Sequence, residues 1–462
     1  MIQAIVGAGG KTTLMHRLAR QYREQGLKVL LTTTTRMFIE PDTLCAGSAE
    51  EIRRALETGG YAMAGVADGE KIGPLPEAVY LEVCQYADMV LVEADGSRQL
   101  PVKYPAPHEP VIPANADEII IVCGLQALGR PLREAAHRWE LAQACLDIDP
   151  DAPLTPAHIQ RLVRQGYVQP LKRRYPDKAM RIHPTHDGSL YQRALAGVIA
   201  ADMDADLIHR EWFEPQPELF VCGGGHVSCA LVQMASLLDF RVRVMDDREE
   251  FANRERFPDA HEVICAGFDQ LDKYLRPNAC CVVVTRGHRD DLLCVQTILR
   301  QPFRYLGMIG SRMKVEKTFE NLRHAGATQA QLDAIHAPIG LRIGAVTPAE
   351  IAVSILAEII QEKNRTHIAS ASRELLELQQ HGMLCIIIEK TGSSPRGVGS
   401  MMFVGRDETI GSIGGGAVEF AAIEDARSHP QAAIRQYHLN NRDSARLGMI
   451  CGGSNRVLFV PV

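Results

Sequence analysis

The twelve cysteines of this 462-residue chain form no CxxC pair, so the spacing typical of a structural zinc site is missing. Several of them lie inside apolar stretches that read as strands, such as Cys222 and Cys385, and Cys280 stands next to Cys281. Scattered thiols of this kind are typical of proteins kept reduced. The pattern therefore argues against both a disulfide framework and a zinc site.

Long apolar runs are also missing. No stretch is long enough to span a bilayer, and no charged leader precedes an apolar segment at the N-terminus. We therefore expect a cytoplasmic protein without a membrane partner. The formal net charge is −6, which gives none of the positive excess that nucleic-acid binding needs. Small molecules and proteins are the expected partners.

The length corresponds to about three domains at roughly 100 to 200 residues per domain. Strand and helix patterns alternate through the first two thirds of the chain, which is typical of α/β folds with parallel sheets. The polar stretches "FEPQPE" and "EKNRTHIASAS" read as linkers. We predict a parallel-sheet domain over 1–214, a Rossmann domain over 218–367 and a small glycine-rich α+β domain over 368–462.

The first glycine-rich loop lies in "AIVGAGGKTTLMHRLA", between a short apolar strand and an amphipathic helix. Phosphate binding needs convergent backbone N–H groups, an ammonium group and a hydroxyl that helps hold Mg²⁺. A full P-loop has a glycine where this chain has Ile5, so the loop is a shortened, P-loop-like version. The candidate ligands of a nucleoside triphosphate with Mg²⁺ are Gly7, Gly9, Gly10, Lys11, Thr12 and Thr13.

A second element supports this interpretation. The apolar stretch "MVLVEADGSR" ends in acids, where a P-loop protein keeps the carboxylate that orients its metal. We predict that Asp95, with Glu93 as second choice, acts with Thr12 at the metal and with Lys11 in catalysis. The alternative is a tight glycine turn with two capping acids. No NKxD tetrad is present, so the choice between ATP and GTP and the question of hydrolysis stay open.

The stretch "LPVKYPAPHEPVIP" is too rich in proline to be a helix interior. It carries Lys103, His108 and Glu109 on a stiff segment after the Asp95 strand. Two interpretations are open: a plain connector, or a second wall of the phosphate site.

Residues 1 to about 190 resemble the YqeC family, through "GAGGKTT", "TTTTRMF", "VEADGSR" and "PAPHEPVIP". Members of this family are regarded as accessory proteins of selenium-dependent molybdenum hydroxylases. The resemblance implies a pathway more than a reaction.

The second glycine-rich loop, "FVCGGGHVSCA", also follows an apolar strand, and about twenty residues later "RVRVMDDRE" ends another strand in acids. A glycine loop and an acid at this spacing are typical of a dinucleotide-binding Rossmann fold. Gly223, Gly225 and His226 are the candidate phosphate ligands and Asp246 the candidate ribose ligand. Fold alone does not give function, but NAD(P) is the default ligand, and Asp246 favours NAD.

The second half of the chain resembles the XdhC/CoxI family. "YLGMIGSRMK" and "DDREEFANRERFPDA" are similar to its Rossmann domain, and "EKTGSSPRGVGSMMFV" and "GSIGGGAVE" to its other domain. In most members the glycine-rich domain comes first, whereas here it comes last, so the arrangement is permuted. The resemblance implies a maturation factor that binds the molybdenum cofactor and delivers it, in sulfurated form, to enzymes of the xanthine dehydrogenase type.

The last domain carries chemistry that fits such a role. Cys451 lies in a glycine-flanked turn, where an accessible thiolate could contact a soft metal or sulfur; the alternative is a small residue that fills a tight turn. Gly415 and Glu419, in "SIGGGAVE", are candidates for the site of an anionic pterin phosphate. The family commonly has a cysteine where this chain has Ala417, which argues against a mechanism with two thiols.

These observations predict an accessory factor for selenium-dependent molybdenum hydroxylases, with Lys11, Asp95 and Cys451 as catalytic groups and the molybdenum cofactor as cargo. The expected partners are the client hydroxylase and a sulfurtransferase, and fold analogy favours a homodimer. Two alternatives stay open: an NAD(P)-dependent oxidoreductase regulated by its N-terminal domain, and a scaffold whose first loop no longer turns over nucleotide.

Overall fold

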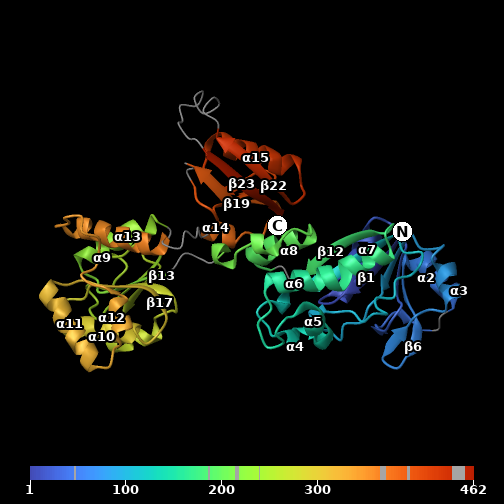
Figure 1. Ribbon diagram of the computed structural model, residues 1–462, viewed down its shortest axis with the longest axis horizontal. Helices are drawn as coiled ribbons and strands as arrows, with labels where there is room; N and C mark the ends of the chain where they lie inside the picture. Colours follow the sequence, from blue (N-terminus) through green and yellow to red (C-terminus); the bar gives the residue numbers. More distant parts are fainter. Residues whose placement is uncertain are drawn as a thin grey trace.

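The computed structural model describes residues 1–45, 48–185, 188–213, 218–238, 240–364, 371–392, 396–439 and 453–462. It contains two parallel sheets covered by helices and a smaller antiparallel sheet with one long helix (Figure 1). The predicted mixed α/β fold class is therefore confirmed. Among the described residues, no helix combines the length and the apolarity needed to cross a bilayer.

The first domain is built on a seven-stranded sheet in which every described pairing is parallel. Its strands, in spatial order, are β12 (Ala179–Thr185), β10 (Glu118–Gly124), β1 (Ile2–Gly7), β8 (Met89–Glu93), β2 (Val29–Thr33), β5 (Tyr61–Ala64) and β4 (Thr43–Leu44). The central strands are buried on both faces, as a parallel sheet between helices requires. Because β8 lies beside β1, the acids that end β8 lie next to the loop that follows β1.

Helices cover both faces of this sheet. α1 (Lys11–Glu24) packs on one face through Leu14 and Met15. On the other face, α2 (Ala49–Gly59) and α3 (Glu77–Val83) cover β2 and β8. α5, α6, α7 and α8 join the core around β1 and β10. Their bounds are Trp139–Leu146, Pro156–Val163, Gln169–Arg174 and Leu190–Ala200.

Short elements complete the first domain. β9 (Val102–Lys103) pairs in parallel with β11 (Ala136–His137). A small antiparallel sheet contains β3 (Met37–Phe38), β7 (Lys71–Gly73) and β6 (Val66–Asp68). The β9–β11 pair fixes the proline-rich stretch after β8 and so holds Lys103 close to the loop.

The second domain has a six-stranded parallel sheet in the order third, second, first, fourth, fifth, sixth strand, which is the Rossmann order. The strands are β15 (Glu262–Cys265), β14 (Arg241–Asp246), β13 (Glu218–Cys222), β16 (Ala279–Val283), β17 (Phe303–Met308) and β18 (Ile335–His336). α9 (His226–Ser236) and α13 (Pro348–Asn364) cover one face. α10 (His288–Ile298) and α11 (Arg312–His324) cover the other. The predicted Rossmann domain is confirmed.

The third domain is a five-stranded antiparallel sheet with α15 (Gly416–Ser428) on one face. Its strands are β21 (Thr409–Gly411), β20 (Met401–Val404), β19 (Met383–Gly392), β23 (Gly453–Pro461) and β22 (Ala433–Leu439). The opposite face shares a hydrophobic core with α8 of the first domain. A Cβ atom on Gly197 of α8 would lie 2.8 Å from the carbonyl oxygen of Pro461, so the close approach depends on glycine there.

Candidate functional sites

The first loop turns the chain from β1 into α1 through three glycines with positive φ: Gly7 at 90°, Gly9 at 85° and Gly10 at 122°. A Cβ atom on Gly7 would lie 2.0 Å from the carbonyl oxygen of Val122. α1 begins at Lys11 with no side-chain cap and no acid in its first turn. Its first N–H groups and the positive end of its dipole therefore favour an anion.

Lys11 points inward from the start of α1. Its Nζ donates to the carbonyl of Gly7 at 2.7 Å and to Ser97 Oγ at 3.0 Å, and it lies 3.7 Å from Glu93 Oε1. Burial lowers the pKa of Lys11 and raises the pKa of Glu93. Thr12 and Thr13, in contrast, are exposed in the first helical turn. The loop, the ammonium group and the two hydroxyl residues thus all lie at one end of α1, as predicted.

Asp95 is fully buried behind the loop. Its Oδ2 accepts from Tyr167 OH at 2.6 Å and from the backbone N–H of Gly7 at 3.3 Å, and its Oδ1 pairs with Lys103 Nζ. Both oxygens therefore have protein partners, and Asp95 connects the loop to the rest of the domain. Its predicted role at Mg²⁺ stays a prediction. Among the described residues, no group of three or more His, Cys, Asp or Glu side chains has a metal-binding arrangement.

Tyr167 was not predicted from the sequence. It lies in a single π-helical turn, Arg164–Val168, between α6 and α7, and such turns often occur at functional sites. Burial and the nearby Asp95 carboxylate raise the pKa of Tyr167 well above its usual value, so it stays protonated and donates. It lies 72 positions from Asp95, and no local motif links the two.

Of the three polar residues of the proline-rich stretch, Lys103 contacts Asp95 directly, and Glu109 is linked to Asp95 through Lys103. Lys103 Nζ contacts Asp95, the carbonyl of Gly96 at 2.6 Å and Glu109 Oε2 at 2.8 Å. Glu109 also pairs with Arg138. His108 is exposed. The stretch therefore lies against the loop through buried charges.

Glu109 makes the stability of the protein depend on pH, because its carboxylate pairs with Lys103 and Arg138. Burial alone would raise its pKa, but hydrogen bonds from Arg138, Lys103 and the N–H of Ala106 outweigh it and lower the pKa to about 2. A group with a lowered folded-state pKa contributes stability above its unfolded pKa, near 4.3, and loses it as the pH falls toward 2. When the pH falls from 5 to 3, the loss of this contribution from Glu109 should lower the unfolding free energy of the wild type by about 2 kcal/mol.

The measurement is urea unfolding of the wild type and Glu109→Gln at both pH values. The variant is expected to be less stable at pH 5, because Arg138 and Lys103 lose a partner, but to lose less stability on acidification. An equal loss in the two proteins would contradict the assignment.

The second loop follows β13. Gly223 has φ 109°, and a Cβ atom there would lie 2.5 Å from the carbonyl oxygen of Val284, whereas a Cβ atom on Gly225 would meet nothing within 4 Å. α9 begins at the exposed His226. Asp246 ends the neighbouring strand β14, as predicted. The loop is therefore open to a ligand at Gly225 and His226.

The turn before α15 contains Gly415, with φ 72°. Glu419 Oε2 accepts from Ser412 Oγ at 2.6 Å and from the N–H groups of Gly415 at 3.0 Å and Ile413 at 3.1 Å. Burial would raise the pKa of Glu419, but these hydrogen bonds lower it. A pterin phosphate would have to share these donors with Glu419, so its role there stays a prediction. Cys451 lies outside the described residues.

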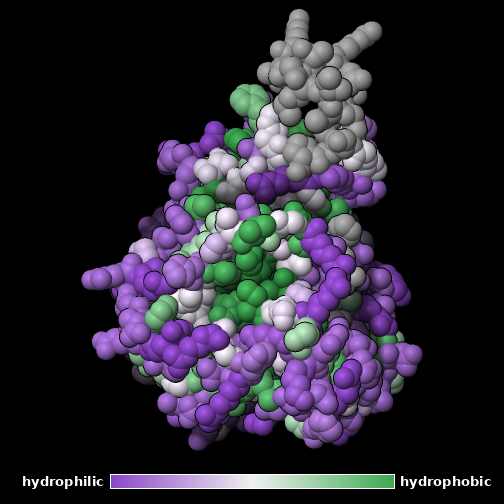
Figure 2. All heavy atoms as spheres, turned by 90° about the vertical axis from the view of Figure 1, so that its left-hand side faces the viewer, coloured by the Kyte–Doolittle hydropathy of each residue, from purple (hydrophilic) through white to green (hydrophobic). Residues whose placement is uncertain are grey.

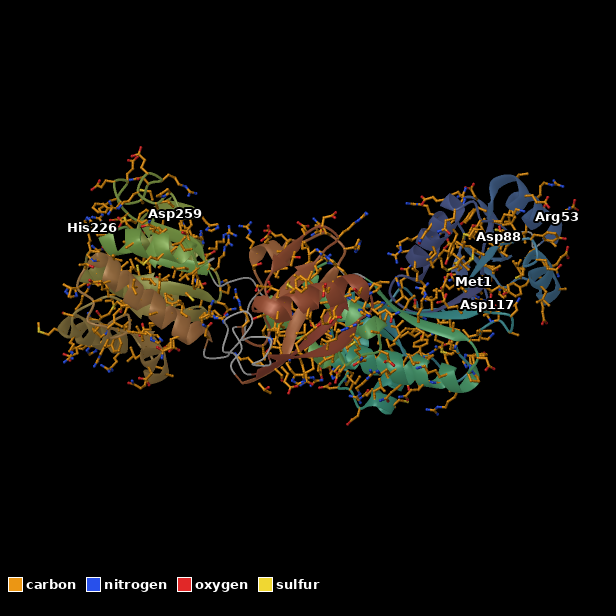
Figure 3. The ribbon with its side chains drawn as sticks, turned by 90° about the horizontal axis from the view of Figure 1, so that it is seen from above. Met1, Arg53, Asp88, Asp117, His226 and Asp259 are labelled. Carbon is orange, nitrogen blue, oxygen red and sulfur yellow. The ribbon has the colours of Figure 1, made fainter. Side chains whose placement is uncertain are left out.

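The first two candidate sites belong to separate domains. The hydrophobic cores around the first loop and the second loop are distinct, and Figure 3 places Met1 and His226 toward opposite ends of the view. Figure 2 looks onto the Rossmann end, where apolar side chains gather in a hollow with a polar rim. The two candidate glycine-loop sites therefore lie in different domains, one in a parallel-sheet domain and one in a Rossmann domain.

Comparisons with known families divide the chain in the same way. The YqeC protein family matches residues 3–140, the XdhC Rossmann domain matches 219–359 and the XdhC and CoxI family matches 375–437. One polypeptide thus carries a match to the YqeC family followed by matches to two domains of the XdhC family, with the Rossmann match first.

Three relatives are each similar to a part of the chain. The uncharacterized protein YqeB of Escherichia coli is 34% identical over 41% of this chain and 34% of its own length. The uncharacterized protein YqeC of the same organism is 36% identical over 35% of this chain and 66% of its own length. A protein of Bacillus subtilis named as a probable xanthine dehydrogenase subunit is 31% identical over 33% of this chain and 44% of its own length. The chain thus spans between about a third and two thirds of these relatives.

Among solved structures, a xanthine dehydrogenase from Bacillus halodurans is 31% identical. The match covers 35% of this chain and 47% of that one, with a TM-score of 0.31.

Proposed function

We propose that this protein is an accessory factor in the maturation of molybdenum hydroxylases of the xanthine dehydrogenase type. The observation that carries the proposal is the presence of YqeC and XdhC matches in one chain. The Bacillus subtilis relative, by its xanthine dehydrogenase name, supports the client class. The molybdenum cofactor is then cargo, held in the Rossmann domain at Gly223, Gly225, His226 and Asp246 and in the last domain at Gly415, Glu419 and Cys451.

In this proposal the first loop binds a nucleoside triphosphate with Mg²⁺. The uncapped start of α1 and the inward Lys11 ammonium fit a polyphosphate. Lys11 would exchange Ser97 Oγ for a phosphate oxygen, and the exposed Thr12 hydroxyl would hold the metal together with Asp95. Asp95 would have to release one of its protein partners to do so. Nucleotide occupancy would then govern loading or release of the cargo, which a sulfurtransferase supplies with sulfur.

An NAD(P)-dependent oxidoreductase is the second candidate, because the strand order and glycine loop of the second domain suit a dinucleotide. One experiment separates the two. The full chain, purified anaerobically, is incubated with molybdenum cofactor and analysed by mass spectrometry and for metal, as wild type, Cys451→Ala and a matched control, Cys265→Ala, which removes an exposed thiol of the Rossmann domain.

Stoichiometric pterin and molybdenum in the wild type and the control, lost in Cys451→Ala, are the expected result. No retention in any of the three proteins, together with tight NAD binding, would overturn the maturation role in favour of the oxidoreductase.

A further inference from the structure

The carboxylate of Asp246 already has a full set of partners. Its Oδ2 accepts from the N–H of Gly224 at 2.8 Å and from Arg248 Nη2 at 3.0 Å, and its Oδ1 accepts from Arg248 N at 3.1 Å and Arg248 Nε at 2.9 Å. Only 2% of Asp246 is exposed. A ribose diol would find this carboxylate neutralised and occupied, which argues against the NAD preference expected from its position.

Arginine side chains surround this end of the loop. Arg248 lies over one side of the Phe251 ring at 3.7 Å from the centroid, and Arg256 is 5.0 Å from the same centroid. Arg256 Nε donates to the carbonyl of Gly224 at 2.8 Å. Its Nη2 is buried and has no hydrogen-bond partner in the part of the chain that the structure describes. A buried donor without an acceptor next to a glycine loop is what an anionic ligand would satisfy.

A third arginine comes from the neighbouring strand end. Arg286, after β16, is exposed and pairs with Asp247 Oδ2 at 3.1 Å. Asp247 also lies 3.7 Å from Arg248 Nε. The guanidinium groups of Arg248 and Arg286 therefore pair with Asp246 and Asp247, while Arg256 lies beside them on the Phe251 ring and at Gly224. The carboxylate of Glu250 also interacts electrostatically with Arg248. A doubly charged phosphate monoester fits such a set better than a neutral sugar hydroxyl.

We propose that this edge of the Rossmann domain recognises a phosphate monoester through Arg248, Arg256 and Arg286. The inference rests on the proposed function for the presence of a ligand at this loop. It adds that the bound group of this ligand is a phosphate monoester. The monoester belongs either to the terminal phosphate of a pterin cofactor or to the 2′-phosphate of an adenine dinucleotide. In both cases an arginine beside the ribose-binding position donates hydrogen bonds to the phosphate, as in NADP-binding Rossmann folds.

The test compares two probes that differ by one phosphate, 2′,5′-ADP and 5′-AMP, by calorimetry on the full chain. We expect 2′,5′-ADP to bind at least 10-fold more tightly. Arg286→Ala should reduce the preference several-fold, and Arg248→Ala should abolish or reverse it, because it also frees Asp246 for the ribose hydroxyls. Arg241→Ala is the matched control: this exposed arginine begins β14, at the opposite end from Asp246. Loss of the preference in Arg248→Ala and Arg286→Ala, with the preference kept in Arg241→Ala, assigns the binding to this edge of the Rossmann domain.

Displacement of bound 2′,5′-ADP identifies the source of the phosphate. A pterin phosphate that displaces it, where the dephosphorylated pterin does not, indicates the pterin cofactor; NADP that displaces it, where NAD does not, indicates the dinucleotide. Equal or tighter binding of 5′-AMP, or binding of neither probe, would overturn the inference. Molybdenum retention without a phosphate preference would refute this inference alone, and a phosphate preference without molybdenum retention would refute the proposed function alone.

Discussion

Replacing Lys103 by methionine is expected to lower the unfolding free energy of the first domain by about 3–5 kcal/mol at pH 7, the range for breaking a buried ion pair by removing one partner. Lys103 is 2% exposed and lies between Asp95 and Glu109. Methionine keeps most of the side-chain volume but removes the ammonium group. Asp95 then stays buried with Tyr167 OH and the N–H of Gly7 as its donors.

Tryptophan fluorescence during urea unfolding can follow this change. The chain has two tryptophans: Trp212 belongs to the core shared by the first and third domains, and Trp139 is partly buried and packs against that core. The matched control is Lys172→Met, which removes an exposed ammonium group from α7 and should change the unfolding free energy by less than about 0.5 kcal/mol.

The pH dependence gives Lys103→Met a second signature. Without the ammonium group, one of the hydrogen bonds that lower the pKa of Glu109 is lost, so Glu109 is easier to protonate in the folded state and acidification should cost the variant less stability than the wild type. An unchanged urea midpoint at pH 7 would mean that Lys103 does not stabilise the buried carboxylates.

The fold could be predicted from the sequence where local patterns determine it. The amphipathic helix predicted after the first glycine loop is observed over Lys11–Glu24, because its apolar residues recur at helical spacing and glycine follows its end. The glycines of the first two loops were identifiable for a related reason. At Gly7 and Gly223 the backbone combines a positive φ with a close approach of a neighbouring strand, and other residues fit neither condition.

The partners of the acidic residues could not be predicted in the same way. Asp95 was expected to face a metal, but whether it does so depends on Tyr167 and Lys103, which reach it only through the packing of α6, α7 and the β9–β11 pair. Asp246 was correctly placed at the end of β14, yet the arginine two residues later occupies its carboxylate. Sequence position gives the place of a side chain along a strand, and tertiary contacts decide what it binds.

Replacing Lys11 by alanine tests whether the first loop binds phosphate, which its position alone does not show. We expect it to weaken binding of a nucleoside triphosphate with Mg²⁺ by at least about 100-fold, corresponding to about 2.7 kcal/mol. The ammonium group is lost from a site where Glu93 and Asp95 remain, so two buried acids would then face the phosphates without Lys11. Calorimetry with ATP and GTP, each with and without Mg²⁺, measures the loss and also resolves the choice of base.

Two neighbouring threonines supply the matched control for the metal. Thr12 and Thr13 are both exposed in the first turn of α1, but only Thr12 stands at the P-loop position whose hydroxyl holds Mg²⁺. Thr12→Val should remove most of the Mg²⁺ dependence of binding, whereas Thr13→Val should keep it. If Lys11→Ala bound nucleotide as tightly as the wild type, the first loop would be a glycine turn without a phosphate, and the second loop would be the remaining candidate for nucleotide binding.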